Sequence, residues 1–334
     1  MNNPLLSICI PTYNRSKYLA QTLDSFVDSK GFDDRVEIII SDNCSTDDTE
    51  KVCKKYTVKY NNFKYYRQLK PTDIADKNFS DALSLGTGAY LKLSNDTLPF
   101  KFDTLEFMID KIMQNIGAGN PLFFHSLYNT PHARETEIEV KNMDGLVSNI
   151  SYGITWIAGF GSWKEQFDKL DNKDKKINVQ LMQVDWTLRL FMKYNKAVIC
   201  FKDMYQPIHI EKKCPYNIYE IFGQNYLDIY KEYLAKNLLS YKAYNNEKKR
   251  LLFKFFLKSI ASSILNSGYS YKLDKIFYYL RDYRYDWFFY ASILLFPIVL
   301  IPEFMKKILR KYFPKIFNKI KRIKNENFNS FMHL

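Results

Sequence analysis

Three runs of branched and aliphatic residues occur in the first 100 residues, and a short segment of small polar residues follows each of them. The runs and the segments after them are 5–10 with 11–15, 36–40 with 41–49, and 88–93 with 94–97. A short apolar run that ends in turn-forming residues is typical of a buried β-strand. The pattern therefore predicts three strands, each with a polar loop at its carboxyl end.

Helical patterns lie between these strands. After the first loop, one face of a predicted amphipathic helix carries Leu19, Leu23, Phe26 and Val27. After the second loop, Ser45 or Thr46 is the expected N-cap of another helix. Strands that alternate with helices predict βαβ units and a parallel sheet, with the loops gathered at one edge.

Asp42 and Asp96 are the acidic residues that follow the second and third predicted strands. Ligands of open α/β sheets bind outside the carboxyl ends of the strands. We therefore expect these two carboxylates close together, although 54 positions separate them. A carboxylate there suits a ligand that donates hydrogen bonds, such as a base imide or a ribose hydroxyl, and the alternative is that Asp42 is only a turn residue.

Four segments, in this order, resemble the family-2 inverting glycosyltransferases, which have the nucleotide-sugar-binding GT-A fold. The segments are ICIPTYNR at the first strand end, EIIISDNCSTDDT at the second, DKNFSDALSLGTGAY before the third, and LKLSND at its end. The resemblance implies an α/β fold of the GT-A class, with a Rossmann-like mixed central sheet flanked by helices. It also implies a nucleotide-sugar donor, with UDP as the commonest nucleotide in the family.

The resemblance assigns donor-binding roles to residues at the strand ends. It implies that Asp42 contacts the base, and that Lys77 and Asn78 stand where the family has an Arg-Asn pair beside the diphosphate. A Lys keeps the positive charge but lacks the bidentate geometry of Arg. The implied nucleotide-binding residues are Pro11, Thr12, Tyr13, Asn14, Asp42, Lys77, Asn78, Ser94 and Asn95.

Residues 94–96 correspond to the family's Asp-x-Asp motif, whose carboxylates hold a divalent cation on the diphosphate. The first acid is Ser94 here, so the resemblance implies that Asp96 is the main ligand for Mn²⁺ or Mg²⁺. Mg²⁺ often takes only one or two carboxylates together with phosphate oxygens and waters. His209 stands where some relatives place a further metal ligand, although a lone His between two Ile residues is more often a packed or surface residue.

An inverting transfer requires a general base, because an acceptor hydroxyl is a weak nucleophile until its proton is removed. Asp185, in the segment VDWTLRL, resembles the family's base at the start of a helix, and the alternative is that it only caps that helix. The buried side of this helix would carry Leu188, Leu190 and Phe191. Trp156 and Trp163 lie in an aromatic, glycine-containing stretch that suits either an acceptor-binding wall or packing in the core.

The implied reaction is a single displacement at the anomeric carbon. The sequence shows no persuasive Cys-His or Ser-His arrangement and no Gly-x-Ser-x-Gly turn that would indicate a covalent intermediate. It also lacks Gly-x-Gly-x-x-Gly and a phosphate loop ending in Gly-Lys-Ser/Thr, which argues against dinucleotide redox chemistry and ATP hydrolysis. Two alternatives remain: a catalytically silent scaffold with this fold, slightly favoured by Ser94, and a sugar nucleotidyltransferase, which normally has a Gly-rich N-terminal phosphate loop.

The net charge of +13 lies entirely in the C-terminal part of the chain. Residues 1–211 carry 26 Lys and Arg against 27 Asp and Glu, whereas residues 212–334 carry 23 against 9. Long helical patterns, including 251–260 and 271–282, replace the alternation of strands and loops near residue 214. We therefore predict a nucleotide-sugar-binding catalytic domain over 1–213 and a helical, basic region over 214–334.

The C-terminal region has two features of a membrane-associating segment. Residues 287–301 are nearly uncharged, but as a helix they would span about 22 Å, less than the roughly 30 Å hydrocarbon core, and Pro297 would interrupt them. Nine Lys and Arg residues between 306 and 324 alternate with apolar residues, as in basic amphipathic helices at anionic membrane surfaces. The alternatives are a helical bundle packed on the catalytic domain and a nucleic-acid-binding surface, and the neutral catalytic half argues against the latter.

Cysteine usage and the N-terminal sequence favour a cytoplasmic location. The five Cys residues are an odd number scattered through the chain, as in proteins with reduced thiols. The first predicted strand begins at residue 5, which leaves no room before it for an export segment. We expect a bacterial enzyme held peripherally on the cytoplasmic side of the inner membrane, where it glycosylates a saccharide or lipid-linked acceptor for surface glycans. The sequence does not indicate an oligomeric state.

Overall fold

The computed structural model describes residues 4–73, 75–127, 130, 134–208, 213–266, 270–313 and 316. The chain divides into two compact units. The first contains Met1–His209 and Asp228–Glu247, and the second contains Ile210–Leu227 and Lys248–Leu334. The assignment of a catalytic domain to 1–213 and a membrane-associating region to 214–334 stays a prediction.

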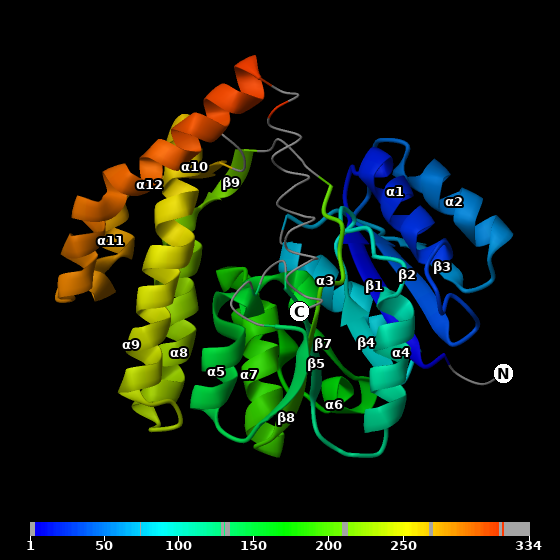
Figure 1. Cartoon of the computed structure of the whole chain (residues 1–334). Helices are drawn as coiled ribbons and strands as arrows, with labels where there is room; N and C mark the ends of the chain where they lie inside the picture. The colour runs from blue at the N-terminus through cyan, green and yellow to red at the C-terminus, as the bar shows by residue number, and fades with distance from the viewer. Residues whose placement is uncertain are drawn as a thin grey trace. The chain divides into compact units, whose positions relative to one another are not determined.

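A five-stranded sheet forms the centre of the first unit (Figure 1). In the sheet order β3-β2-β1-β4-β7, the strands are β3 (Phe63–Arg67), β2 (Val36–Asp42), β1 (Leu6–Thr12), β4 (Tyr90–Leu93) and β7 (Gly161–Trp163). The first four are parallel, and β7 is antiparallel to β4. The register pairs Thr12 with Asp42 and Cys9 with Leu93. The polar segments after β1, β2 and β4 therefore lie at one edge, as predicted.

Helices cover both faces of this sheet, and every residue of β1 and β2 is buried. The helices are α1 (Ser16–Val27), α2 (Thr49–Lys59), α3 (Ala75–Ser84), α4 (Thr104–Asn115), α6 (Lys164–Asp168) and α7 (Met182–Tyr194). Successive strand residues point to opposite faces. Ile8 and Ile10 therefore pack with residues of α1, α2 and α4, whereas Cys9 packs with residues of α3, α6 and α7. The apolar face predicted for the first helix is buried at Leu19, Leu23 and Phe26.

A second, three-stranded sheet in the first unit has the order β5-β8-β6. Its strands are β5 (Leu122–Ser126), β6 (Thr136–Val140) and β8 (Ala197–Lys202). Between β6 and α7 the chain forms α5 (Met143–Ile150) and the 3₁₀ segments η1 (Ser151–Thr155), η2 (Ile157–Gly159) and η3 (Lys173–Val179). β8 is parallel to β5 and antiparallel to β6. The first unit thus has the mixed α/β architecture that the sequence predicted.

The chain after β8 is mainly helical. Most of α8 (Tyr226–Ala235) and α9 (Tyr241–Arg250) belongs to the first unit. The second unit contains β9 (Lys213–Asn217) paired with β10 (Ser270–Lys272), the π-helical turns η4 (Tyr219–Asn225) and η5 (Leu251–Phe256), and the helices α10 (Leu257–Leu265), α11 (Ile276–Tyr279) and α12 (Trp287–Tyr312). The helix predicted over 271–282 is wrong. The chain there begins as β10, and Lys275, with a φ of 54°, delays the helical turn to α11.

α12 is one helix of 26 residues that contains both Pro297 and Pro302. The interruption expected at Pro297 is therefore wrong: the helix continues through both prolines, although each lacks the N–H for one intrahelical hydrogen bond. In the described part of the chain, α12 alone is long and apolar enough to cross a membrane by length and composition, and 22% of its most apolar 18-residue window is buried. Most of the basic pattern predicted beyond residue 313 lies outside the described residues.

Candidate functional site

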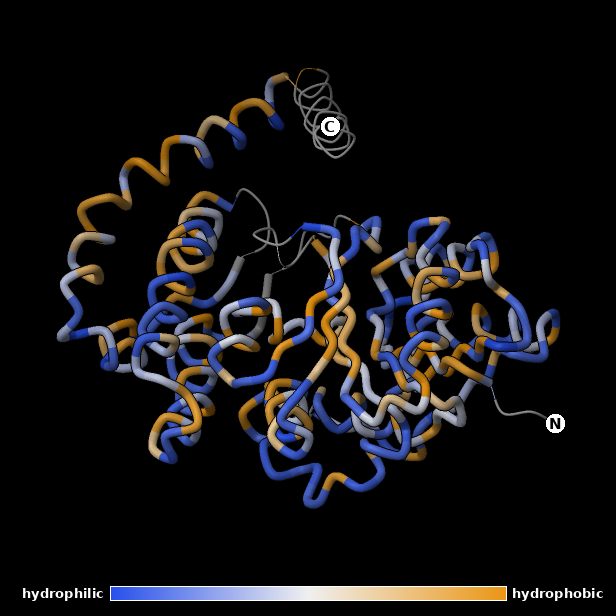
Figure 2. The backbone as a smooth tube through the Cα atoms, turned by 60° about the horizontal axis from the view of Figure 1, so that its bottom comes forward, coloured by the Kyte–Doolittle hydropathy of each residue, from blue (hydrophilic) through white to orange (hydrophobic). Residues whose placement is uncertain are grey.

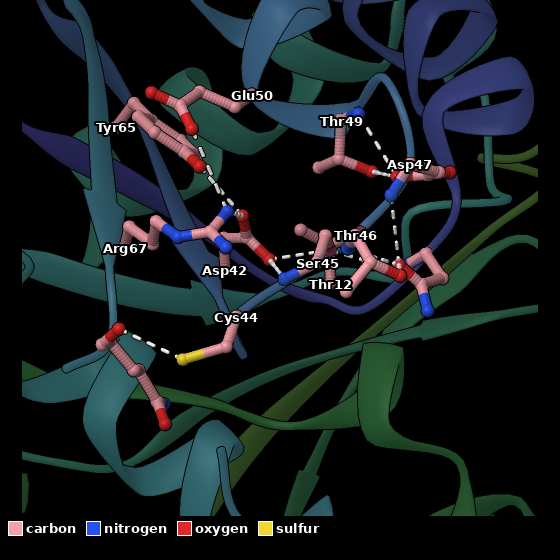
Figure 3. Close-up of polar contacts among 12 residues, drawn as sticks. Thr12, Asp42, Cys44, Ser45, Thr46, Asp47, Thr49, Glu50, Tyr65 and Arg67 are labelled. Carbon is pink, nitrogen blue, oxygen red and sulfur yellow. Dashed lines mark hydrogen bonds and ion pairs between the residues drawn. The ribbon is translucent and has the colours of Figure 1, made fainter. Parts of the chain in front are cut away.

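Asp42, the last residue of β2, is fully buried, and hydrogen-bond donors surround its carboxylate (Figure 3). Oδ1 accepts from the Ser45 N–H at 2.9 Å and from the Ser45 hydroxyl at 2.5 Å. Oδ2 accepts from the Tyr65 hydroxyl at 2.6 Å and from Arg67 Nη1 at 3.3 Å. Burial and the bond to Asp42 raise the pKa of the Tyr65 hydroxyl, which therefore stays a donor. A ligand N–H that bonds to Asp42 must share or replace one of these donors.

The loops after β1 and β2 are tied to each other. Asn14, with a φ of 52°, accepts from the Thr46 N–H at 2.7 Å, and its own N–H donates to the Ser45 hydroxyl at 2.8 Å. Asn adopts positive φ more readily than most residues. The N-cap of α2 predicted at Ser45 or Thr46 is wrong, because the helix begins at Thr49 and its N-cap residue is Asp48. The Asp47 side chain accepts from the Thr49 N–H at 3.0 Å.

Asn78, in the first turn of α3, is buried and connects that helix to the ends of β1 and β2. Its Oδ1 accepts from the Ser41 hydroxyl at 2.8 Å. Its Nδ2 donates to the carbonyl oxygens of Thr12 and Ser41 at 3.4 and 3.3 Å. Lys77, the preceding residue, is 44% exposed and pairs with Asp81. Asn78 therefore holds α3 against the strand ends, and Lys77 lies at the surface of the same turn.

The segment after β4 also meets β1. The Thr12 hydroxyl donates to Asp96 Oδ2 at 2.9 Å, so the last residue of β1 is bonded directly to the predicted metal ligand. Beside Asp96, Ser94 Oγ and Asn95 Oδ1 are buried and have no hydrogen-bond partner within the described part of the chain. Most buried polar atoms in native proteins have a partner, so these two oxygens are available to a water, an ion or a ligand.

The metal ligands that the side chains of Ser94, Asn95 and Asp96 offer are oxygen atoms. Oxygen is the ligand type that Mg²⁺ and Mn²⁺ prefer. Nowhere in the described ranges do three or more His, Cys, Asp or Glu side chains form a metal-binding group. A cation at this edge would therefore depend on one carboxylate and on oxygens of the donor itself. His209, the other predicted ligand, lies outside the described residues.

Lys92 is fully buried two positions before Ser94. Its ammonium donates to the carbonyl oxygens of Leu93 and Phe160 at 3.3 and 3.2 Å, and to that of Ala158. Burial lowers the pKa of Lys92 to about 7. These bonds fasten residues 158–160 to the carboxyl end of β4.

The two predicted acceptor-binding tryptophans are both partly buried and pack against the same hydrophobic core. Trp163 pairs with Tyr90, the first residue of β4, and the ring centroids are 5.3 Å apart. The Trp163 indole N–H donates to the Asn120 carbonyl at 2.9 Å. This partly buried position at the amino end of β4 fits the packing alternative, and an acceptor-binding role of Trp163 stays a prediction. Trp156 precedes the segment fastened by Lys92 and packs edge-on against Tyr205.

Asp185 lies in the first turn of α7, and the N-cap of that helix is Leu181, so the capping alternative for Asp185 is wrong. Asp185 is 3% exposed, and its Oδ2 accepts from Arg189 Nε at 2.8 Å. Arg189 also donates to the carbonyl oxygens of Asp171 and Asn172 at 2.6 and 3.3 Å. Burial raises the pKa of Asp185, against the lowering effect of Arg189. The predicted buried side of α7 is confirmed at Leu188, Leu190 and Phe191.

Side-chain hydrogen bonds thus tie four of the nine predicted donor residues, Thr12, Asn14, Asp42 and Asn78, into one edge of the sheet. Of the others, Pro11 is buried within β1 and Tyr13 is 51% exposed. The sequence did not indicate Tyr65 and Arg67, because β3 has the sequence FKYYR and lacks an apolar run. It also did not indicate Asp76, which contacts α7.

Residues 7–151 match the family model described as Glycosyl transferase family 2. The chain contains a glycosyl transferase family 2 domain. The resemblance that the sequence motifs indicated is therefore confirmed. The matched residues of the family 2 domain include Thr12, Asp42, Asn78 and Asp96, whereas Asp185 lies beyond them.

The family 2 domain has relatives among bacterial glycosyltransferases. The chain is 42% identical over 86 residues to the abequosyltransferase RfbV of Salmonella typhimurium, an alignment that covers 26% of each chain. The chain thus spans about a quarter of that relative's length. It is 25% identical over 280 residues to the GalNAc(5)-diNAcBac-PP-undecaprenol beta-1,3-glucosyltransferase of Campylobacter jejuni, covering 81% of this chain and 84% of the other.

Solved structures share the fold at low sequence identity. The crystal structure of S. aureus TarS 1–349 in complex with UDP-GlcNAc superposes with a TM-score of 0.59 at 18% identity, covering 92% of both chains. The mannosyltransferase PcManGT from Pyrobaculum calidifontis, in complex with GDP-Man and Mn²⁺, has a TM-score of 0.51 at 11% identity and covers 93% of this chain and 89% of its own. The predicted GT-A fold is confirmed.

Proposed function

We propose that this protein transfers a sugar from a nucleotide-sugar donor, with UDP as the nucleotide, to a saccharide acceptor in the synthesis of a bacterial surface polysaccharide. The observation that supports this best is the joining of Thr12, Asn78 and Asp96 by hydrogen bonds at the edge where β2 ends in Asp42. Open α/β sheets bind their ligands at this edge. The glycosyltransferase relatives and the UDP-GlcNAc complex of the TarS fold support the same class of reaction.

The donor's nucleotide lies across the ends of β1 and β2 in this proposal. Asp42 accepts an N–H of the base, and Arg67 is the partner that gives way. Arg67 makes the longest contact to Asp42, is partly exposed, and has Glu50 as a second partner at 3.7 Å. Lys77 moves from Asp81 to the donor and balances the charge of the departing diphosphate. Asn78 holds α3 in place, because protein groups already occupy its amide.

Ser94, Asn95 and Asp96 would hold a divalent cation, Mn²⁺ or Mg²⁺, with Asp96 as the charged ligand. Such an ion, when bound, supplies positive charge that stabilises the diphosphate leaving group. The two buried oxygens without hydrogen-bond partners support this position. The Mn²⁺ in the mannosyltransferase neighbour is a further, fold-level argument.

Asp185 acts as the general base in the transfer. Its carboxylate takes the proton of the acceptor hydroxyl while the acceptor oxygen forms a bond to the anomeric carbon, and the bond from that carbon to the diphosphate breaks. Attack from the face opposite the diphosphate inverts the anomeric configuration. A base with a raised pKa is better matched to this task at neutral pH than an exposed Asp.

A thermal-shift panel of UDP-, GDP- and dTDP-sugars, each with and without Mn²⁺, tests the proposal. A ligand at 100 times its Kd stabilises the folded state by about 2.7 kcal/mol. For a unit of roughly 200 residues, this corresponds to an increase in Tm of about 5 °C or more. We expect such a shift with a UDP-sugar and Mn²⁺. A panel without any shift would contradict the proposal, and pyrophosphate release from a nucleoside triphosphate would favour the nucleotidyltransferase alternative.

We further propose that α12 lies in the surface of an anionic membrane and so brings the enzyme to a lipid-linked acceptor on the cytoplasmic side. Hydrophobic residues recur along α12 (Figure 2). An exposed stripe of apolar side chains, each 49–80% exposed, follows the helical repeat: Trp287, Tyr290, Leu294, Ile298, Ile301 and Met305. The uncharged part, 287–302, spans about 24 Å, which is shorter than the hydrocarbon core and suits an interfacial position. Lys306, Lys307, Arg310 and Lys311 follow it. The undecaprenol in the name of the Campylobacter relative supports a lipid-linked acceptor.

Replacing Leu294, Ile298 and Ile301 of this stripe together with Gln is expected to weaken binding to vesicles that contain phosphatidylglycerol by about 10²-fold or more. Each fully buried large apolar side chain contributes about 1.5–3 kcal/mol, and partial insertion still leaves a large sum. Vesicle flotation measures the partition coefficient. The matched control replaces Val58 and Leu69, which are also exposed but lie in the first unit, and it should bind like the parent. Equal binding by the triple variant and the parent would contradict this role of α12.

A further inference from the structure

The N-terminus of α7 is capped by a residue from another helix. Asp76, the second residue of α3, is 1% exposed, and its Oδ2 accepts from the backbone N–H of Met182 at 3.0 Å. Met182 is the first residue of α7, and the N-cap residue Leu181 makes no side-chain hydrogen bond. A carboxylate at a helix N-terminus satisfies an unpaired N–H and interacts favourably with the helix dipole. The first turn of α7 therefore depends on Asp76 for this contact.

The two helices that Asp76 joins carry different parts of the proposed reaction. In α3, Lys77 and Asn78 directly follow Asp76 and lie at the donor edge. In α7, the N–H of Asp185 donates to the carbonyl oxygen of Leu181 at 3.4 Å. Leu181 directly precedes Met182, whose N–H donates to Asp76. One side-chain contact and one helical turn thus connect the donor-binding helix to the proposed base.

The rest of α7 is held by other contacts. Trp186 Nε1 donates to the Lys173 carbonyl at 2.9 Å, and Gln183 Nε2 donates to the Thr155 carbonyl at 2.6 Å. Met182, Trp186 and Leu190 are buried in the core with residues of α3 and α6. Loss of the Asp76 contact would therefore leave the helix folded and would loosen its first turn, where Asp185 lies.

We propose that Asp76 is a positioning residue that sets the place of Asp185 relative to the donor bound at α3. This inference rests on the proposed glycosyl transfer. Reacting groups must be held to within fractions of an ångström, and a displacement of 1 Å by a change away from the chemistry can cost about 10²-fold in rate. Asp76 is buried and bonded to α7, and it is not one of the proposed donor- or acceptor-binding residues, so its loss should lower kcat and leave nucleotide affinity intact.

The test compares Asp76→Ala, Asp76→Asn and the control Asn142→Ala at pH 8. Asn142 caps α5 by accepting from the Gly145 N–H at 2.8 Å, so the control removes a side-chain cap elsewhere in the same unit. We measure UDP·Mn²⁺ affinity and the rate of UDP release from the sugar nucleotide that stabilises the parent, beginning with UDP-N-acetylglucosamine. Asp76→Ala should lower the rate by about 10²-fold. Asp76→Asn, whose amide oxygen still accepts from Met182, should remain within about 5-fold of the parent, and the control within about 2-fold.

Hydrogen exchange provides a readout that does not need turnover. Protection of residues 181–188 should fall in Asp76→Ala and persist in Asp76→Asn. Two results for Asp76→Ala would overturn the inference while the proposed function stands. One is a rate of UDP release at least half that of the parent, and the other is a UDP affinity that falls by the same factor as this rate. A parent protein that binds no sugar nucleotide would instead overturn the proposed function, and this inference with it.

Discussion

Replacing Asp185 with Asn is expected to lower kcat by about 10²–10⁴-fold, the usual contribution of a general base, while UDP affinity stays within about 3-fold of the parent. The amide can still accept from Arg189, so the fold of α7 is preserved and only the proton acceptor is removed. Initial rates of UDP release and titration with UDP·Mn²⁺ separate these two effects. The matched control is Asp168→Asn, an exposed acid in an ion pair with Lys164, which should retain the parent's rate.

The pH dependence gives a second test of the same role. Because the base must be ionised, activity should fall as the pH decreases through the pKa of Asp185, and burial places that pKa above the usual value for Asp. Arg189 lowers the pKa, so Arg189→Gln should raise it and move the acid limb of kcat/KM to higher pH. A transfer rate in Asp185→Asn above half of the parent's would rule out Asp185 as the base. Sugar transfer that is present in the parent and lost in Asp185→Asn would rule out the catalytically silent scaffold.

Replacing Asp96 with Asn is expected to remove the effect of Mn²⁺ on UDP binding and to lower kcat/KM by about 10²–10³-fold. A bound cation contributes several kcal/mol of charge stabilisation, and each 1.36 kcal/mol is tenfold in rate. Asp96 is the only carboxylate of the segment 94–96, so no neighbouring acid in it can replace it. The Asn oxygen can still accept from the Thr12 hydroxyl, which preserves the link to β1. UDP binding measured with and without Mn²⁺ gives the result directly.

The control for Asp96 is Asp103→Asn, an exposed acid that pairs with Lys202 on the same unit. It should keep the parent's response to Mn²⁺, because Asp103 pairs with Lys202 and is not part of the segment 94–96. If Asp96→Asn kept an unchanged response to Mn²⁺, the cation would not be bound at residues 94–96. The departure from the family motif at Ser94 makes this the most informative metal experiment.

The local pattern was sufficient to predict the framework of the site. Apolar runs located β1, β2 and β4, and the residues directly after them are those that meet at the carboxyl edge. The helix that carries Asp185 was also predicted, because its buried side repeats at helical spacing. Periodicity of this kind depends on neighbours a few residues apart, and it can therefore be found without tertiary information.

The partners of those residues could not be predicted in the same way. Asp42 is bonded to Tyr65 and Arg67, and Asp76 to Met182, across 23, 25 and 106 positions. Trp163 shared its aromatic stretch with Trp156, and only the register with Tyr90 showed that Trp163 lies at the amino end of β4. A hydrogen bond between distant segments leaves no periodic signal in either one.

The sequence alone thus determined the order of strands and helices, the edge of the sheet that carries the polar residues, and the family of the domain. Local propensity and apolar spacing act along the chain, and both are visible in it. The tertiary structure decided which donors surround Asp42, how α3 holds the first turn of α7, and that α12 continues through two prolines. Each of these depends on groups brought together by burial of the whole core, where buried polar groups must find partners wherever the fold places them.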